Sequence, residues 1–136
     1  MANYKEAIAK VLRTEGGYVN DPDDAGGETY KGIARKFWPA WIGWETVDKM
    51  KSNVGFPKCL NEASYIQAAV MSFYKINFWD KVGGDHIASQ TIADNLVDSA
   101  VNEGIKSAVK RAQSIVDMAQ TGIVSEELVT KLNSLI

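Results

Sequence analysis

The chain has 136 residues, of which 46% are hydrophobic, so it is long and apolar enough to bury one core and is not a disordered chain. Lys and Arg number 15 against 17 Asp and Glu, a formal net charge of −2, which argues against nucleic acid or an anionic membrane as a partner, because such binding shows as clustered basic charge. Cys59 and His86 are each the only residue of their type, which excludes an intrachain disulfide and a cysteine-based zinc site, and we expect no cofactor.

The spacing of apolar residues predicts a mainly α fold. Asn3 and Glu6 resemble a capping box, and apolar residues follow at helical spacing. We expect this first helix to end at Gly16-Gly17, where a left-handed residue can close it. Thr29 is then expected to cap a short helix that Pro39 stops. Only residues 17–28 are left for a short loop or small hairpin.

More helices are expected along the rest of the chain. A Trp-rich turn leads into a short helix before residue 50, and Asn61 begins a long helix. Ser125 is a good N-cap for the last one, with acidic residues in its first turn. The expected ranges of the later helices are 61–79, 89–103, 106–120 and 126–135.

The stretch TEGGYVNDPDDAGGETYKGIA, residues 14 to 34, concentrates glycines and acidic side chains. It begins like the calcium loop of an EF-hand, with Asp21 and Asp23 at the first and third positions. Ala25 stands at the fifth position, however, and Gly32 stands where the bidentate glutamate belongs. Two ligand positions therefore fail, and we expect no metal site.

Glu15 is the candidate general acid. It lies eleven residues after Tyr4, which at ~100° per residue returns it to the same helix face. Burial and the negative end of the helix dipole would both raise the pKa of this carboxyl, and a protonated carboxyl is what a general acid for glycoside cleavage requires. Gly16 and Gly17 leave space beside it for a substrate. The competing interpretation is a glutamate at a helix end that faces water.

A glycosidase also needs a second carboxylate across its cleft. Asp24 follows Glu15 by nine residues, on a loop that is expected to fold back over the helix end. Asp21 is the rival and a candidate substrate contact, but it precedes Pro22 and can equally form a turn by accepting backbone hydrogen bonds. The sequence favours Asp24 for chemistry and Asp21 for structure.

The segment EGGYVNDPDDAGGETYKGIA resembles the signature of glycoside hydrolase family 108, the N-acetylmuramidases of phages and bacteria, some of which are labelled secretion activator proteins. YKINFWD at 74–80 and IADNLVDSAVNEG at 92–104 resemble later blocks of that family, so the resemblance covers most of the chain. It implies a lysozyme-like helical fold and hydrolysis of the β-1,4 bond between N-acetylmuramic acid and N-acetylglucosamine. Glu15 matches the glutamate taken as the catalytic acid.

The resemblance bears on Thr29 and Tyr30 in different ways. The order Glu, Asp, Thr is similar to phage-type lysozymes, in which the threonine helps to hold the attacking water, so Thr29 is the candidate for that role and a helix cap is its alternative. Family members commonly have Thr-Asn where this chain has Thr29-Tyr30, so a sugar contact through that Asn is not carried over.

Other candidate substrate contacts are aromatic or lie on a later helix. Tyr18 and Tyr30 are closest in sequence to Glu15 and could stack on sugar rings, although aromatics at such positions more often belong to the core. Asn95, Asp98 and Asn102 fall within ~60° on one side of an otherwise apolar helix, and Asp98 and Asn102 are the candidates there. They could line a cleft or bond to neighbouring loops.

The sequence predicts one domain, with a lysozyme-like catalytic part at 1–88 and C-terminal helices at 89–136 that resemble a shortened peptidoglycan-binding region. The N-terminus lacks a Sec-type signal, and no stretch approaches the ~20 apolar residues of a membrane span. We therefore expect a monomeric muramidase or endolysin, made in the cytoplasm, that reaches the peptidoglycan glycan strands of the wall after lysis or holin-type export. The alternatives are a lytic transglycosylase and a non-catalytic module that binds the wall or assists secretion.

Overall fold

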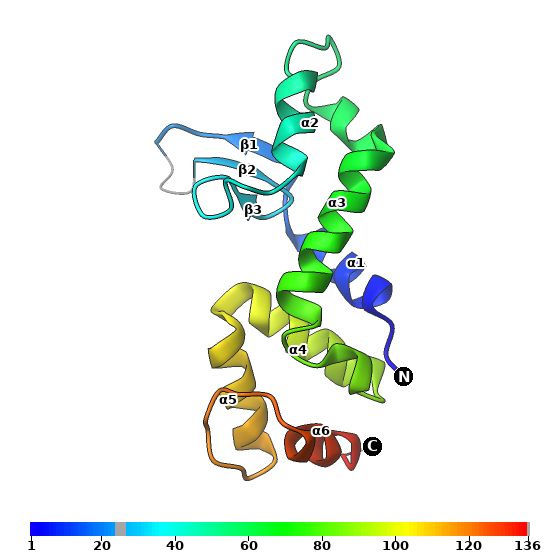
Figure 1. Cartoon of the computed structure of the whole chain (residues 1–136), viewed down its shortest axis with the longest axis vertical. Helices are drawn as coiled ribbons and strands as arrows, with labels where there is room; N and C mark the ends of the chain where they lie inside the picture. Colours follow the sequence, from blue (N-terminus) through cyan, green and yellow to red (C-terminus); the bar gives the residue numbers. More distant parts are fainter. Residues whose placement is uncertain (24–26, 136) are drawn as a thin grey trace. The chain divides into compact units, whose positions relative to one another are not determined.

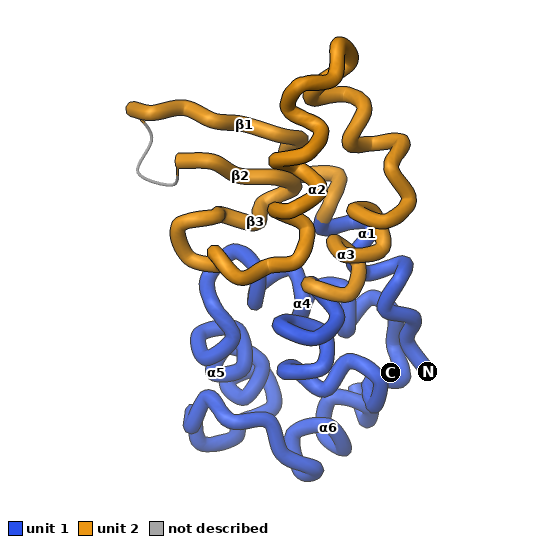
Figure 2. The backbone as a smooth tube through the Cα atoms, turned by 45° about the horizontal axis from the view of Figure 1, so that its top comes forward, with its two compact units in different colours: residues 1–11, 74–136 blue, residues 12–73 orange. Residues whose placement is uncertain are grey.

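The computed structural model describes residues 1–23 and 27–135. The chain divides into two compact units, unit 1 with residues 1–11 and 74–136 and unit 2 with residues 12–73 (Figure 2). The boundaries between them fall within helix α1 (Tyr4–Thr14) and at the end of helix α3 (Ser64–Tyr74). The expected mainly α fold with a short hairpin after the first helix is confirmed. The division at residue 88 stays a prediction.

Unit 2 carries a small antiparallel sheet of three strands in the order β1 (Tyr18–Asn20), β2 (Glu28–Tyr30) and β3 (Ile33–Ala34) (Figure 1). Lys31 and Gly32 form the turn between β2 and β3 with φ values of 47° and 82°, the left-handed values that a type I′ hairpin turn requires.

The short helix expected after Thr29 is absent. Thr29 pairs with Val19 on one side and Ala34 on the other. Tyr30 and Ile33 face each other across the turn and are both fully buried. Burial of this cross-strand pair stabilises the strand pairing over a helix, so the prediction that Thr29 caps a helix is wrong.

The helical part of unit 2 consists of α2 (Gly43–Met50), the 3₁₀ turn η1 (Lys58–Glu62) and α3. The helix expected from Asn61 begins at Ser64 instead, because Ala63 is extended with φ −83° and ψ 104°. The core of unit 2 is built from buried side chains of the sheet and of these helices, including Tyr30, Ile33, Trp44, Val47, Leu60 and Ile66.

Unit 1 is helical in its described residues. After the start of α1 it contains the π-helical turn η2 (Lys75–Trp79), the 3₁₀ turn η3 (Gly84–His86), and helices α4 (Gln90–Glu103), α5 (Ile105–Ile115) and α6 (Glu126–Asn133). Helices α4 and α5 lie side by side (Figure 1). The buried side chains of this unit include Ile8, Trp79, Ile87, Val97, Val109 and Leu128.

The helix ends are set mostly by local chemistry. The Ser89 and Ser125 hydroxyls accept hydrogen bonds from the third residue of α4 and α6 respectively, as expected for N-caps. Helix α5 ends five residues before the expected position, and Asp117, two residues beyond its end, takes a left-handed φ of 58°. Among the described residues, every helix falls short of the length and hydropathy needed to cross a bilayer.

The first helix departs from the prediction at both of its ends. The Asn3 side chain accepts hydrogen bonds from the Lys5 and Glu6 amides at 2.8 and 3.4 Å, as an N-cap does. In a capping box the backbone amide of Asn3 would donate to the Glu6 side chain. Here that amide donates to Gln90 Oε1 at 2.7 Å instead. At the other end, α1 stops at Thr14. Neither Gly16 nor Gly17 takes a left-handed φ, so the predicted glycine closure is wrong.

Candidate active site

Glu15 is the first residue beyond α1, and its side chain is half-buried. Gly16 and Gly17 follow it, both exposed. A Cβ atom added to either glycine would meet no atom of the described residues within 4 Å. The backbone beside Glu15 is therefore open, as the sequence predicted, and a ligand can approach it closely.

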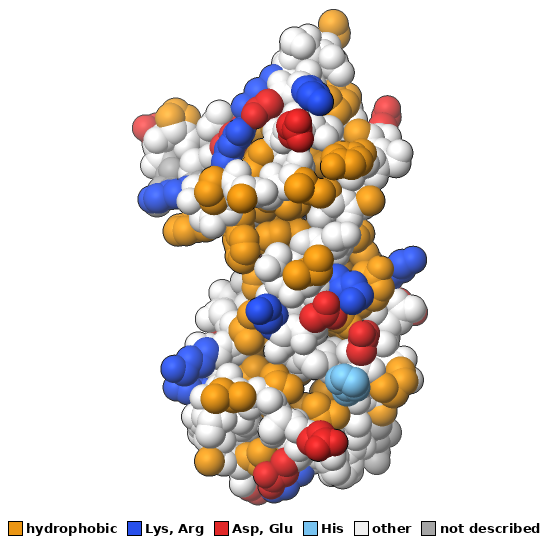
Figure 3. Space-filling view, viewed as in Figure 1, with side chains coloured by type: hydrophobic (Ala, Val, Ile, Leu, Met, Phe, Trp, Pro, Cys, Tyr) orange, Lys and Arg blue, Asp and Glu red, His pale blue; other side chains and the backbone are white. Residues whose placement is uncertain are grey.

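Glu28 is the centre of a charged cluster in unit 2, the Glu28 cluster, formed by Tyr18, Glu28, Arg35, Asp48 and Lys51. The Tyr18 hydroxyl donates to Glu28 Oε2 at 2.5 Å, Lys51 Nζ lies 2.7 Å from the same oxygen, and an Arg35 guanidinium nitrogen lies 2.9 Å from Oε1. Arg35 also binds both carboxylate oxygens of Asp48, at 2.7 and 2.8 Å. Figure 3 shows acidic and basic side chains interleaved over β2 and α2.

The cluster fixes the protonation state of Glu28. Burial by itself raises the pKa of this carboxyl, but hydrogen bonds from Lys51, Tyr18 and Arg35 outweigh burial and hold the pKa below its ordinary value. Burial and the bond to the Glu28 carboxylate raise the pKa of the Tyr18 phenol. Glu28 is thus ionised at neutral pH, and both of its oxygens accept hydrogen bonds. This suits a structural link between the sheet and helix α2 and does not suit a proton donor.

Tyr18 is half-buried, and its ring meets that of Phe56 edge to face, with the centroids 4.9 Å apart. Sequence reasoning assigned Tyr18 to sugar stacking and missed its place in the Glu28 cluster. The partners come from β1, from the turn after β3 and from the end of α2, so no local spacing links them. Stacking by Tyr18 stays a prediction.

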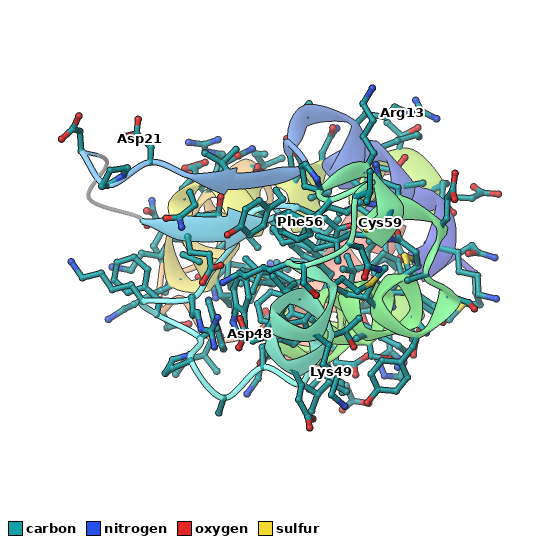
Figure 4. The ribbon with its side chains drawn as sticks, turned by 90° about the horizontal axis from the view of Figure 1, so that it is seen from above. Arg13, Asp21, Asp48, Lys49, Phe56 and Cys59 are labelled. Carbon is teal, nitrogen blue, oxygen red and sulfur yellow. The ribbon has the colours of Figure 1, made fainter. Side chains whose placement is uncertain are left out.

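Asp21 projects from the outer end of β1 (Figure 4). Its Oδ1 accepts a hydrogen bond from the Asp23 amide at 2.9 Å, the geometry of an Asx turn. This confirms the turn-forming interpretation of Asp21, while a substrate contact by Asp21 stays a prediction. Asp24, the predicted second carboxylate, lies outside the described residues.

Tyr30 is fully buried. Its hydroxyl donates to Asn61 Oδ1 at 2.9 Å and accepts from Gln67 Nε2 at 2.8 Å. A ring enclosed in this way has no free face for a sugar, so the structure contradicts the predicted stacking by Tyr30. Its neighbour Thr29 is half-buried within β2, and the role of its hydroxyl in holding water stays a prediction.

Asp98 and Asn102 lie on α4 of unit 1, whereas Glu15 and the Glu28 cluster belong to unit 2. Both side chains are exposed. Neither makes a hydrogen bond or ion pair with the described residues, so internal bonding to neighbouring loops is not observed. Their contact with substrate stays a prediction.

In the described part of the chain, no group of three or more His, Cys, Asp and Glu side chains could hold a metal ion.

Comparison with solved structures finds the structure of SagA from Brucella abortus, with a TM-score of 0.66 and 26% sequence identity over 98% of this chain and 70% of that chain. No curated protein matches the sequence. The family model described as Glycosyl hydrolase 108 matches residues 8–104. The matched range holds Glu15 and the whole Glu28 cluster and covers most of the chain, which confirms the resemblance seen in the sequence. The chain therefore belongs to the glycosyl hydrolase 108 family.

Proposed function

We propose that this protein hydrolyses the β-1,4 bond between N-acetylmuramic acid and N-acetylglucosamine in peptidoglycan, with Glu15 as the general acid. Membership of a glycosyl hydrolase family and the similarity to SagA support a peptidoglycan-related role. The observation that carries the assignment of Glu15 is its position: it is half-buried and is followed by two glycines with open space beside their backbone.

In the proposed mechanism, the Glu15 carboxyl gives its proton to the glycosidic oxygen as the C1–O bond breaks. Positive charge develops at the anomeric centre as an oxocarbenium-like state. Asp24 stabilises this charge or directs a water molecule to C1, and the Thr29 hydroxyl helps to hold that water. As the water oxygen bonds to C1, its proton passes to a carboxylate, either Asp24 or the now ionised Glu15. Carboxyl groups about 6.5–9.5 Å apart would give inversion, and about 5–5.5 Å would give retention.

The proposal is tested by the release of reducing ends from purified peptidoglycan. Glu15→Gln keeps the shape of the side chain and removes the acid, so we expect a loss of roughly 10²- to 10⁴-fold in rate. Glu45→Gln is the matched control, because Glu45 on α2 is exposed and its side chain has no bonded partner among the described residues. Substantial activity in the Glu15→Gln variant would remove Glu15 from the role.

Mass spectrometry of the products separates this function from its rivals. Hydrated reducing ends are expected, because water adds to C1. Anhydro ends would instead identify a lytic transglycosylase. Sedimentation with cell walls without new ends would identify a non-catalytic wall-binding module. As a hydrolase, the protein would act on the wall after cell lysis or holin-type export.

A further inference from the structure

The segment after β3 presents aromatic side chains to solvent. Phe37 is 69% exposed and Trp38 is 38% exposed, and Lys36 before them is exposed as well. We call these three residues the aromatic patch. Hydrophobic side chains reach the surface over β3 and the segment that follows it (Figure 3). Contiguous exposed apolar side chains mark binding surfaces more often than single ones do, and Phe37 and Trp38 are neighbours in the chain.

Trp38 differs from the other three tryptophans in its indole N–H. Trp41 donates to the Ala69 carbonyl at 3.3 Å, Trp44 donates to the Trp38 carbonyl at 2.9 Å, and Trp79 donates to Asp85 Oδ1 at 2.8 Å. The Trp38 indole donates to no group among the described residues. It is an exposed apolar ring with an unused hydrogen-bond donor, which suits a ligand with both an apolar face and an acceptor.

Contacts within unit 2 fix the position of the Trp38 side chain and backbone. Its ring meets Phe73 edge to face, with centroids 4.8 Å apart and planes at 90°. Its amide donates to the Ala34 carbonyl at 2.9 Å, and its own carbonyl accepts the Trp44 indole. A ring fixed in this way loses little entropy when a ligand binds, so it is pre-organised for recognition.

Lys36 adds one positive charge to this surface. Its ammonium lies 5.8 Å from the centroid of the Phe37 ring, within the range of a cation–π contact. Lys36 forms no ion pair with the described residues, whereas the neighbouring Arg35 is bound to Glu28 and Asp48. The patch thus offers two rings, one N–H donor and one unpaired cation.

We propose that the aromatic patch binds an N-acetylhexosamine unit of the peptidoglycan strand, as an anchoring site additional to Glu15; this rests on the proposed function. The C–H face of the sugar packs on the rings, its acetamide carbonyl accepts the Trp38 N–H, and Lys36 pairs with a carboxylate of the stem peptide. A lipid surface fits less well, because the patch holds a single unpaired cation and a donor whose direction is fixed by packing.

Nuclear magnetic resonance of the four indole N–H groups tests the contact directly. The Trp38→Phe variant identifies the Trp38 signal by its loss. Titration with a chitin tetrasaccharide, which carries the same acetamido groups, is expected to move this signal more than the three internally bonded ones. A Trp38 signal that stays in place while other signals move would overturn the proposal.

Sedimentation with purified peptidoglycan tests the anchoring role, using Glu15→Gln as the parent so that the wall is not digested. Trp38→Phe keeps the packing on Phe73 and removes the donor, so a two- to tenfold loss of retained protein is expected from roughly one hydrogen bond. Phe37→Ala and Lys36→Ala should also weaken retention. Tyr65→Ala is the control, since Tyr65 on α3 is an aromatic residue of unit 2 that is 61% exposed and lies outside the patch.

The results separate the two proposals. Unchanged retention in all the patch variants, with reducing ends still released by the wild type, overturns the anchoring site and leaves the proposed function standing. Absence of reducing ends in the wild type overturns the hydrolase, while loss of retention in the patch variants still supports the glycan contact. Retention that follows phosphatidylglycerol vesicles instead of peptidoglycan overturns the glycan assignment.

Discussion

Glu28 keeps a charge in a mostly enclosed position because three donors from different elements meet its two oxygens. The side chain is only 12% exposed, and a carboxylate this enclosed is costly unless its lone pairs are satisfied. Tyr18, Arg35 and Lys51 satisfy them. The cluster therefore ties the hairpin that follows Glu15 to helix α2.

The pH dependence of stability follows from this arrangement. The pKa of Glu28 is held below its ordinary value of 4.5, so its contribution is fully present above that pH and is lost as the pH falls through the folded-state value. Glu28→Gln should lower the free energy of unfolding by about 1–3 kcal/mol at neutral pH. The difference from wild type should shrink in acid.

Urea denaturation of both proteins, in steps from about pH 7 to about pH 3, measures this difference. Glu45→Gln, which removes a side chain with no bonded partner among the described residues, should stay close to wild type throughout. A gap between Glu28→Gln and wild type that is constant or grows as the pH falls would contradict the assignment of the Glu28 cluster.

At the scale of the element, helix α4 shows how local signals define a boundary. Ser89 caps its start, and Gly104 ends it with φ 96° and ψ 152°, a backbone conformation that is essentially restricted to glycine. Both ends were predicted from sequence, because capping depends on residues a few positions apart. Thr29 has the same kind of local cap signal, but it lies in a strand and not at a helix start. Its pairing with Val19 and Ala34, on the two neighbouring strands, determines this conformation.

Gly104→Ala should destabilise the protein by about 1–3 kcal/mol through backbone strain. A Cβ atom at this position would lie more than 4 Å from every atom that the structure describes beyond its chain neighbours, so the expected destabilisation comes from the backbone and not from steric contact. Gly55→Ala is the comparison: its Cβ would lie an ordinary 3.6 Å from Cys59 Cβ, and its φ lies outside the left-handed range. Thermal unfolding of the two variants distinguishes the cases, and equal midpoints would refute the argument from strain.

At the scale of the molecule, the family and the mainly α architecture could be predicted because both are carried by contiguous stretches. The EGGY signature, the helical periodicity and the serine caps all lie within short windows of sequence. The partners of Glu28 and the enclosure of Tyr30 could not be predicted, since they depend on residues brought together from the sheet, α2 and α3. The general-acid role of Glu15 stays a proposal.

An activated leaving group tests that role most directly. In a dinitrophenyl glycoside of an N-acetylglucosamine oligosaccharide, the dinitrophenolate group leaves without being protonated. The glycosidic oxygen of the natural substrate needs a proton from a general acid before it can leave. If Glu15 is the acid, Glu15→Gln should lose roughly 10²-fold or more in kcat/KM on peptidoglycan and retain most of its rate on the dinitrophenyl substrate. Equal losses on both substrates, or no loss on peptidoglycan, would contradict the assignment.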